Sequence, residues 1–235
     1  MKTLGLIGGM SWESTQLYYR LINEGVRAEL GGLHSASLIL QSVDFAPIEQ
    51  MQAEGQWARA GAQLAGIAKR LEMAGADGVI LCTNTMHKVA EPIADALSVP
   101  FLHIGDVTRA AIEAAGYSQV SFLGTRFTMD EPFMIDRLQT DSLRVDVPDL
   151  ADREIINRVI FEELCRGKTL EASRAEYHRI IQQLADQGAE AVVFGCTEIG
   201  MLVDPASLPI PCLDTTQLHA DAAVSWMLSI KRMPG

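Results

Sequence analysis

Short apolar runs alternate with longer amphipathic segments along most of this 235-residue chain. Short apolar runs are typical of buried strands, and longer segments with helical spacing of apolar positions are typical of helices that cover a sheet. The alternation predicts βαβ units and a mostly parallel sheet, which places the protein in the α/β class. The predicted strands are 4–7, 37–40, 79–81, 101–104, 120–123, 143–147 and 191–194, and the predicted helices are 14–30, 57–74, 87–97, 107–115, 154–164, 170–187 and 215–228.

The chain also repeats itself weakly. AGADGVILCTNT aligns without a gap on QGAEAVVFGCTE, and this alignment pairs Thr83 with Cys196. VPFLHIGD resembles IPCLDTTQ, and LGLIGGMS resembles VSFLGTRFT, each at nearly the same separation along the chain as the first match. Three matches in one order predict two pseudo-symmetric α/β subdomains. The expected boundaries are 1–105 for the first half, joined by the C-terminal helix 215–235, and 106–214 for the second half.

Two of the apolar runs end in similar polar stretches, CTNT at 82–85 and GCTE at 195–198. Ligands of α/β sheets bind outside the carboxyl ends of parallel strands. We therefore expect an active site in a cleft between the halves, with Thr83 and Cys196 on opposite sides of one ligand. Two proton-carrying groups on opposite faces of one carbon are what stereoinversion requires.

The two residues are not equivalent chemically. A cysteine has an ordinary pKa of about 8.5, which a helix N-terminus lowers, and we expect this for Cys196. A threonine hydroxyl is a much weaker acid, so Thr83 would hand over or relay a proton. The alternative for Thr83 is that its hydroxyl only caps the helix that follows.

Composition narrows the range of partners. The chain has 19 Lys and Arg against 30 Asp and Glu, a formal net charge of −11, and no basic run. Nucleic acid and membranes are therefore not expected as partners. The four cysteines show no CxxC spacing and the N-terminus does not resemble a signal peptide, so we expect a cytoplasmic protein with reduced thiols.

Four motifs carry a family resemblance. GLIGGMSWEST, CTNTMH, FEELCRGK and FGCTEIG, in this order, resemble the aspartate/glutamate racemase family, which works without pyridoxal phosphate or metal. The resemblance implies a racemase that needs no cofactor. Family members usually carry a cysteine in each half, and Thr83 stands where the first cysteine is expected. This version resembles a Thr/Cys subset that racemises from the L enantiomer.

The resemblance also implies a set of substrate contacts. Asn84, Thr85 and Thr197 would bind the α-carboxylate, with plain helix capping as the alternative. Lys168 would meet a side-chain carboxylate, unless it is only solvated. Aspartate-specific members place an arginine where this chain reads VDFAPIEQMQ; Gln52 would stand in for it, which leaves glutamate or a broader range open. The remaining expected pocket residues are Met10, Ser11, Thr125 and Glu198.

Other interpretations stay open. A decarboxylase or isomerase of the same superfamily would need only one cysteine. A catalytically silent amino-acid binding protein would have kept the cleft after losing the first cysteine. We interpret His87, His103 and His219 as structural residues, and expect no metal site. We expect a homodimer that acts on a small amino acid.

Overall fold

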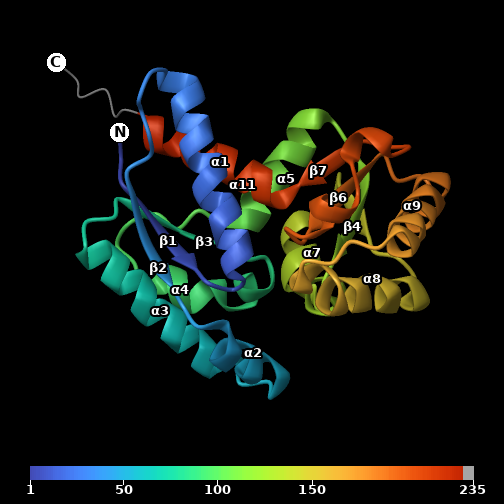
Figure 1. Cartoon of the computed structure of the whole chain (residues 1–235), viewed down its shortest axis with the longest axis horizontal. Helices are drawn as coiled ribbons and strands as arrows, with labels where there is room; N and C mark the ends of the chain where they lie inside the picture. The colour runs from blue at the N-terminus through green and yellow to red at the C-terminus, as the bar shows by residue number, and fades with distance from the viewer. Residues whose placement is uncertain (230–235) are drawn as a thin grey trace. The chain divides into compact units, whose positions relative to one another are not determined.

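The chain forms two β-sheets, each made of parallel strands, in the computed structural model, which describes residues 1–229 (Figure 1). The strands are β1 (Leu4–Gly8), β2 (Leu38–Ser42), β3 (Gly78–Leu81), β4 (Gln119–Gly124), β5 (Arg144–Asp146), β6 (Ala191–Gly195) and β7 (Cys212–Asp214). The first sheet has the order β2-β1-β3 and the second has the order β5-β4-β6-β7. Every strand pair is parallel, which confirms the predicted fold class.

Helices connect the strands, and each of the predicted helical segments contains one. The α-helices are α1 (Trp12–Leu30), α2 (Phe45–Ala53), α3 (Trp57–Met73), α4 (Ala90–Asp95), α5 (Ile104–Ala115), α6 (Arg126–Asp130), α7 (Pro132–Leu138), α8 (Leu150–Glu162), α9 (Glu171–Asp186), α10 (Ile199–Leu202) and α11 (Thr215–Leu228). The 3-10 helices are η1 (Thr85–Val89), η2 (Leu164–Arg166) and η3 (Pro205–Ser207). The predicted helix 87–97 is thus divided between η1 and α4. No helix among residues 1–229 combines the length and hydrophobicity that a membrane crossing requires.

The chain divides into two units. The first comprises Met1–His103 and the described residues from His219 onward, and the second comprises Ile104–Leu218. The part of the expected C-terminal helix beyond residue 229 lies outside the described residues. α5 follows the strands of the first sheet but contributes Ile112 to the core of the second unit. α11 follows the strands of the second sheet but contributes Ala220 to the core of the first unit.

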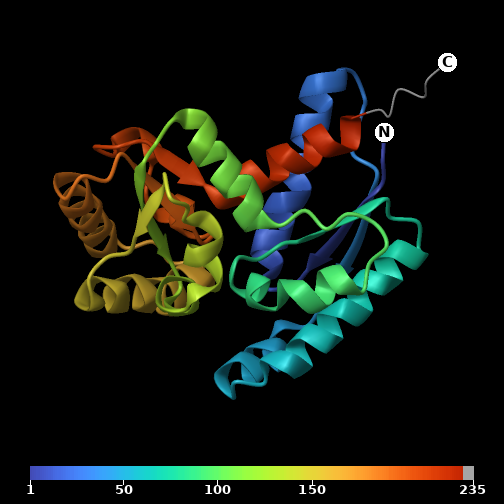
Figure 2. The same cartoon turned by 180° about the vertical axis from the view of Figure 1, so that it is seen from behind.

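Both faces of the first sheet are covered by helices. Leu6 and Ile80 pack with α1 and α11 on one face, and Ile7 and Leu81 pack with α3 on the other, as strand alternation requires. Figure 2 shows α3 and α4 side by side. A sheet buried on both faces explains why its strands read as continuous apolar runs.

The strand register accounts for the internal repeat. Gly78 of β3 pairs with Leu4 of β1, and Ala191 of β6 pairs with Val120 of β4. The sequence repeat aligns Gly78 with Ala191 and Leu4 with Val120. Each of these strand pairs is therefore the counterpart of the other, and the two sheets are built on one plan.

The predicted strand 101–104 is wrong. Phe101 makes an isolated parallel bridge to Val79, and α5 already begins at Ile104. Ile104 is buried in the second unit's core, which draws the chain away from the sheet. The repeat aligns Phe101 with Cys212 of the second sheet, and Cys212 does lie in a strand, β7.

The two sheets differ in side-chain size at equivalent positions. A Cβ atom on Gly195 would lie 1.9 Å from the Phe122 ring, so only glycine fits there. The repeat makes Cys82 the equivalent of Gly195, and Leu6 the equivalent of Phe122. Leu6 and Cys82 are both buried in one core cluster, where the smaller Leu6 leaves room for a side chain.

Candidate active site

The first group of predicted site residues belongs to the first unit. β1 and β3 are paired, with Ile7 opposite Leu81, so the segments that follow them begin at the same sheet edge. Ser11, Thr83 and Thr85 are half-buried, and the other three members are buried. We call these residues the first half-site: Met10, Ser11, Gln52, Thr83, Asn84 and Thr85.

The main chain of Thr83 is held on both sides. Its N–H donates to the Leu81 carbonyl at 2.9 Å, and its own carbonyl oxygen accepts a hydrogen bond from His87 Nδ1 at 2.7 Å. The Thr83 hydroxyl makes no hydrogen bond with any of residues 1–229, and Asn84 is the residue that precedes η1. The capping alternative for Thr83 is therefore wrong. Asn84 does not cap η1 through its side chain either.

Ser11 has a local structural task. Its hydroxyl accepts the Ser14 N–H at 3.2 Å, which caps α1, and its carbonyl accepts from the Thr15 hydroxyl at 2.8 Å. Thr15 in turn accepts the Gly9 N–H at 2.8 Å. Ser11 and Met10 are thus fixed beside the end of β1, and their contact with substrate stays a prediction.

Gln52 is the buried member contributed by α2. Its Nε2 donates to Met86 Sδ at 2.8 Å, and Met86 is fully buried in η1. This contact ties α2 to the segment that carries Asn84 and Thr85. A substrate role for Gln52 stays a prediction.

The second group of predicted site residues belongs to the second unit. Gly124 of β4 pairs with Gly195 of β6, so Thr125 and Cys196 each come directly after paired strand ends. Thr125 is buried, with its hydroxyl 3.4 Å from that of Thr128. We call these residues the second half-site: Thr125, Lys168, Cys196, Thr197 and Glu198.

Cys196 is paired with a carboxylate. Its thiol donates to Glu198 Oε2 at 2.9 Å, and the thiol-bearing residue is only 8% exposed. Burial, together with the negative charge of Glu198, raises the pKa of Cys196 well above its ordinary value. The expected lowering of this pKa by a helix is therefore wrong: α10 begins only at Ile199 and is four residues long. In the resting protein Cys196 is a thiol and Glu198 its hydrogen-bond acceptor.

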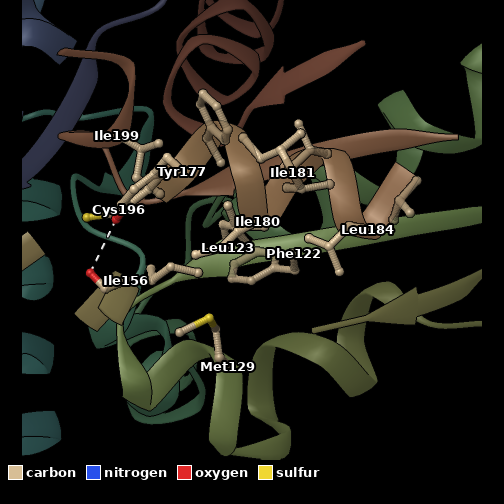
Figure 3. Close-up of a cluster of buried hydrophobic side chains, with 14 of the residues drawn as sticks. Phe122, Leu123, Met129, Ile156, Tyr177, Ile180, Ile181, Leu184, Cys196 and Ile199 are labelled. Atoms are coloured by element: carbon tan, nitrogen blue, oxygen red, sulfur yellow. Dashed lines mark hydrogen bonds between the residues drawn. The ribbon is translucent and has the colours of Figure 1, made fainter. Parts of the chain in front are cut away.

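Apolar packing accounts for the burial of Cys196. Figure 3 draws it at one end of the second unit's core, with Tyr177 and Ile199 labelled beside it. The Tyr177 hydroxyl donates to the Ile156 carbonyl at 3.2 Å. Burial raises the pKa of Tyr177 well above its ordinary value, and a thiolate at Cys196 would raise it further, so the proton of Tyr177 stays on the hydroxyl.

Lys168 lies on a constrained turn. Its main-chain N–H donates to the Glu163 carbonyl at 3.0 Å, and Gly167 before it has φ +69°, the left-handed region that favours glycine. The Glu163 carboxylate is buried and accepts the Ser173 hydroxyl at 2.6 Å. Lys168 itself is exposed, and its ammonium pairs with no carboxylate among residues 1–229. It is available for an anionic ligand.

Thr197 is buried and its hydroxyl accepts from the Thr216 hydroxyl at 3.3 Å. Thr216 belongs to α11, and its neighbour Thr215 donates to the Phe194 carbonyl at 2.9 Å. The first turn of α11 therefore supports the segment that carries Cys196.

Three residues around the half-sites were not predicted as part of them. Tyr177 lies on α9, which only the fold brings near Cys196. Glu163 lies between α8 and η2 and accepts the Lys168 N–H from within the same motif, FEELCRGK. His87 follows Thr83 closely in CTNTMH, and this spacing across a tight helical turn could have indicated the contact. Among residues 1–229, no three His, Cys, Asp or Glu side chains are arranged to hold a metal ion.

Comparison with known proteins indicates the class of enzyme to which the chain is similar. A crystal structure of a protein from Yersinia pestis, provisionally assigned as an Asp/Glu racemase, is 50% identical, covers 97% of this chain and 100% of that one, and has a TM-score of 0.93. The structure of an aspartate racemase homologue from Pyrococcus horikoshii is 31% identical, with coverages of 97% and 100% and a TM-score of 0.86. The broad specificity amino-acid racemase RacX of Bacillus subtilis is 27% identical over 162 residues, or 69% of this chain and 70% of RacX. These relatives are racemases or racemase homologues.

The family itself follows from a match along most of the chain. The sequence profile described as Asp/Glu/Hydantoin racemase matches residues 7–223. The chain therefore belongs to the Asp/Glu/hydantoin racemase family, and the resemblance drawn from its four motifs is confirmed.

Proposed function

We propose that this protein is a cofactor-independent racemase that interconverts the L and D forms of aspartate or glutamate. The observation that carries the proposal is the equivalence of Thr83 and Cys196 in two sheets built on the same strand pairing and register. Two proton carriers, one from each unit, match the needs of a reaction that removes a proton from one face of a carbon and returns it to the other. Family membership supports the same reaction class.

The second half-site suggests how the L enantiomer is deprotonated. Glu198 takes the thiol proton through the existing 2.9 Å contact, and the Cys196 thiolate then removes the α-proton. The electron pair moves into the α-carboxylate, which Asn84, Thr85 and Thr197 would stabilise by hydrogen bonding. Thr83 returns a proton to the opposite face. Cys196 is then a thiol again, and exchange with water removes the proton from Glu198 and restores the one on Thr83.

The proposed substrate class rests on charge. Lys168 is exposed and unpaired among residues 1–229, so it can meet a side-chain carboxylate. Gln52 offers an uncharged amide where aspartate-specific relatives are expected to have arginine. Because an amide binds a carboxylate less tightly than a guanidinium does, the site should discriminate less strictly between aspartate and glutamate. A broad-specificity racemase is therefore the second candidate, favoured by this glutamine and by the similarity to RacX.

Two further alternatives make different predictions. A decarboxylase or another isomerase would exchange or replace a substituent on one face only, and a silent binding protein would exchange no α-proton. Action in the cytoplasm as a homodimer belongs to the proposal as an expectation; sedimentation tests the oligomeric part.

The experiment is a substrate scan. Purified protein is incubated with each proteinogenic L-amino acid, in the presence of a chelator and a carbonyl reagent that traps pyridoxal phosphate, and the enantiomers are resolved by chromatography. We expect D-aspartate or D-glutamate to accumulate at rates that neither reagent changes. Accumulation of no D-amino acid, or inhibition by either reagent, would contradict the proposal.

A further inference from the structure

Three buried histidines gather next to the main chain of Thr83 in the first unit. His87, His103 and His219 are 3%, 7% and 0% exposed. The ring centroid of His87 lies 4.5 Å from that of His103 and 6.0 Å from that of His219. His103 is the last residue of the first segment of this unit, and His219 is the first residue of its returning segment. His103 and His219 are thus the residues at which the chain leaves and re-enters the first unit.

The hydrogen bonds of this cluster determine where the ring protons are. The Thr83 carbonyl can only accept, so the 2.7 Å contact requires a proton on His87 Nδ1. His219 Nε2 lies 2.9 Å from the Leu102 carbonyl and must likewise carry a proton. Burial lowers the pKa of His219 to about 4, so this ring is neutral and its Nδ1 accepts from the Tyr18 hydroxyl at 2.9 Å.

His219 is therefore a fixed support. It is held at one nitrogen by α1 and at the other by the main chain of Leu102, and His87 packs between it, His103 and Phe101. The His87 ring has little freedom to turn away from Thr83. This rigidity is informative because a hydrogen bond to a carbonyl is useful for positioning only when the donor cannot move.

The contact limits the freedom of Thr83. Hydrogen bonds to Leu81 and His87 fix the peptide groups before and after Thr83. The position of the hydroxyl oxygen then depends on a single torsion angle, χ1. A β-branched residue is already stiff at χ1. A weak acid such as threonine gains more from exact placement than from acidity, since a displacement of about 1 Å can cost ~100-fold in rate.

We propose that His87 is a positioning residue for Thr83: its Nδ1–H fixes the Thr83 main chain and thereby aims the hydroxyl at the face of the substrate opposite Cys196. The proposal rests on the proposed racemase function and deepens it. His87 touches no reacting atom, so its loss affects the Thr83 step and leaves the Cys196 step intact.

The test separates the two steps in D₂O. Exchange of the α-proton of L-substrate reports Cys196, and the kcat measured from D-substrate reports Thr83. The variants are His87→Leu, which removes the donor, and His87→Asn, whose side-chain N–H can replace Nδ1–H. His34→Leu, a change at an exposed histidine, is the matched control, and circular dichroism checks folding.

We expect His87→Leu to lower kcat from D-substrate by about 10- to 100-fold, with exchange into L-substrate close to that of wild type. His87→Asn should recover most of that kcat, and His34→Leu should match wild type. An unchanged kcat in His87→Leu, equal losses in both His87 variants, or a parallel loss of L-exchange in a folded His87→Leu protein would overturn the proposal.

A second measurement does not depend on activity. Long-range ¹H–¹⁵N spectra of the wild-type protein distinguish the two neutral tautomers of histidine, and we expect His87 to carry its proton on Nδ1. A neutral His87 protonated on Nε2 would overturn the proposal even if His87→Leu failed to fold. A wild-type protein that exchanges no α-proton from either enantiomer would instead refute the racemase function itself.

Discussion

The two half-sites stand on equivalent strand ends but hold their central residues in different ways. Thr83 is fixed through its main chain, by Leu81 and His87, while its hydroxyl makes no hydrogen bond with residues 1–229. Cys196 is fixed through its side chain, which donates to Glu198. The first arrangement provides placement without chemical activation. The second provides a proton acceptor next to a thiol.

This difference shows that a repeated scaffold does not require repeated chemistry. The strand register keeps equivalent positions in equivalent places, with β3 beside β1 in one sheet and β6 beside β4 in the other. The nature of each side chain is set by its neighbours. The two enantiomers have equal free energies, so kcat/KM must be the same in both directions. Unequal proton carriers should therefore appear as different kcat values from the L and D forms, or as different rates of deuterium wash-in.

The largest expected effect is at Cys196. Cys196→Ala should lower kcat from the L enantiomer by at least ~10³-fold, because it removes the proposed base for that face. Cys82→Ala is the matched control: Cys82 is fully buried and burial raises its pKa, so we expect activity close to that of wild type. Steady-state kinetics with a chiral assay measure both. Equal losses in the two variants would refute the pairing of Thr83 with Cys196.

Glu198→Gln tests the carboxylate that distinguishes the second half-site. The charge of Glu198 helps to raise the pKa of Cys196, so its removal should lower that pKa and speed alkylation of Cys196 by iodoacetamide at neutral pH. Turnover should nevertheless fall by about 100-fold, because the acceptor of the thiol proton is weakened. Peptide mass spectrometry separates Cys196 from the exposed Cys165, and Glu162→Gln serves as the control. Slower alkylation in Glu198→Gln would contradict the assigned direction.

Gly195→Ala tests the packing difference between the sheets. The added Cβ would meet the Phe122 ring, so we expect a loss of about 1–3 kcal/mol in the free energy of unfolding. The same change should cost less in a Phe122→Leu background, which copies the Leu6 arrangement of the first sheet. Urea unfolding of the four proteins gives the coupling energy. Strictly additive costs would show that Phe122 is not the reason for this glycine.

The smallest kinetic effect is expected at Lys168. Lys168→Met should raise KM for aspartate or glutamate by about tenfold or more, since a hydrogen bond to a charged group contributes about 1.5–3 kcal/mol. KM for a neutral amino acid should stay the same. Arg166→Met, an exposed change in the same turn, is the control. An equal rise for charged and neutral substrates would mean that Lys168 does not read the side chain.

Much of the scaffold could be predicted because it depends on local patterns. The internal repeat predicted the equivalence of β3 with β6, and α11 has the predicted bounds. The short helices α2, α6, α7 and α10 could not be predicted, because they span too few turns to show a helical period. The strand at 101–104 failed because burial of Ile104 in the other core is a tertiary effect.

The chemistry of the site was less predictable than its location. The sequence placed Cys196 before a helix, but the sign of its pKa shift depends on burial and on the rotamer of Glu198. His87 was interpreted as structural. Its spacing from Thr83 allows a contact, but the orientation of its ring toward the Thr83 carbonyl depends on packing against His103 and His219. Pairwise contacts of this kind carry no signal in hydrophobic periodicity.

The most direct test of the central claim is Thr83→Ala in D₂O, followed by chiral chromatography and mass spectrometry. If Thr83 and Cys196 serve opposite faces, Cys196 still exchanges the α-proton of L-substrate, so deuterated L-substrate accumulates while formation of the D enantiomer falls by at least ~100-fold. Formation of the D enantiomer at the wild-type rate, or loss of L-exchange together with racemisation in a folded protein, would contradict the two-face account.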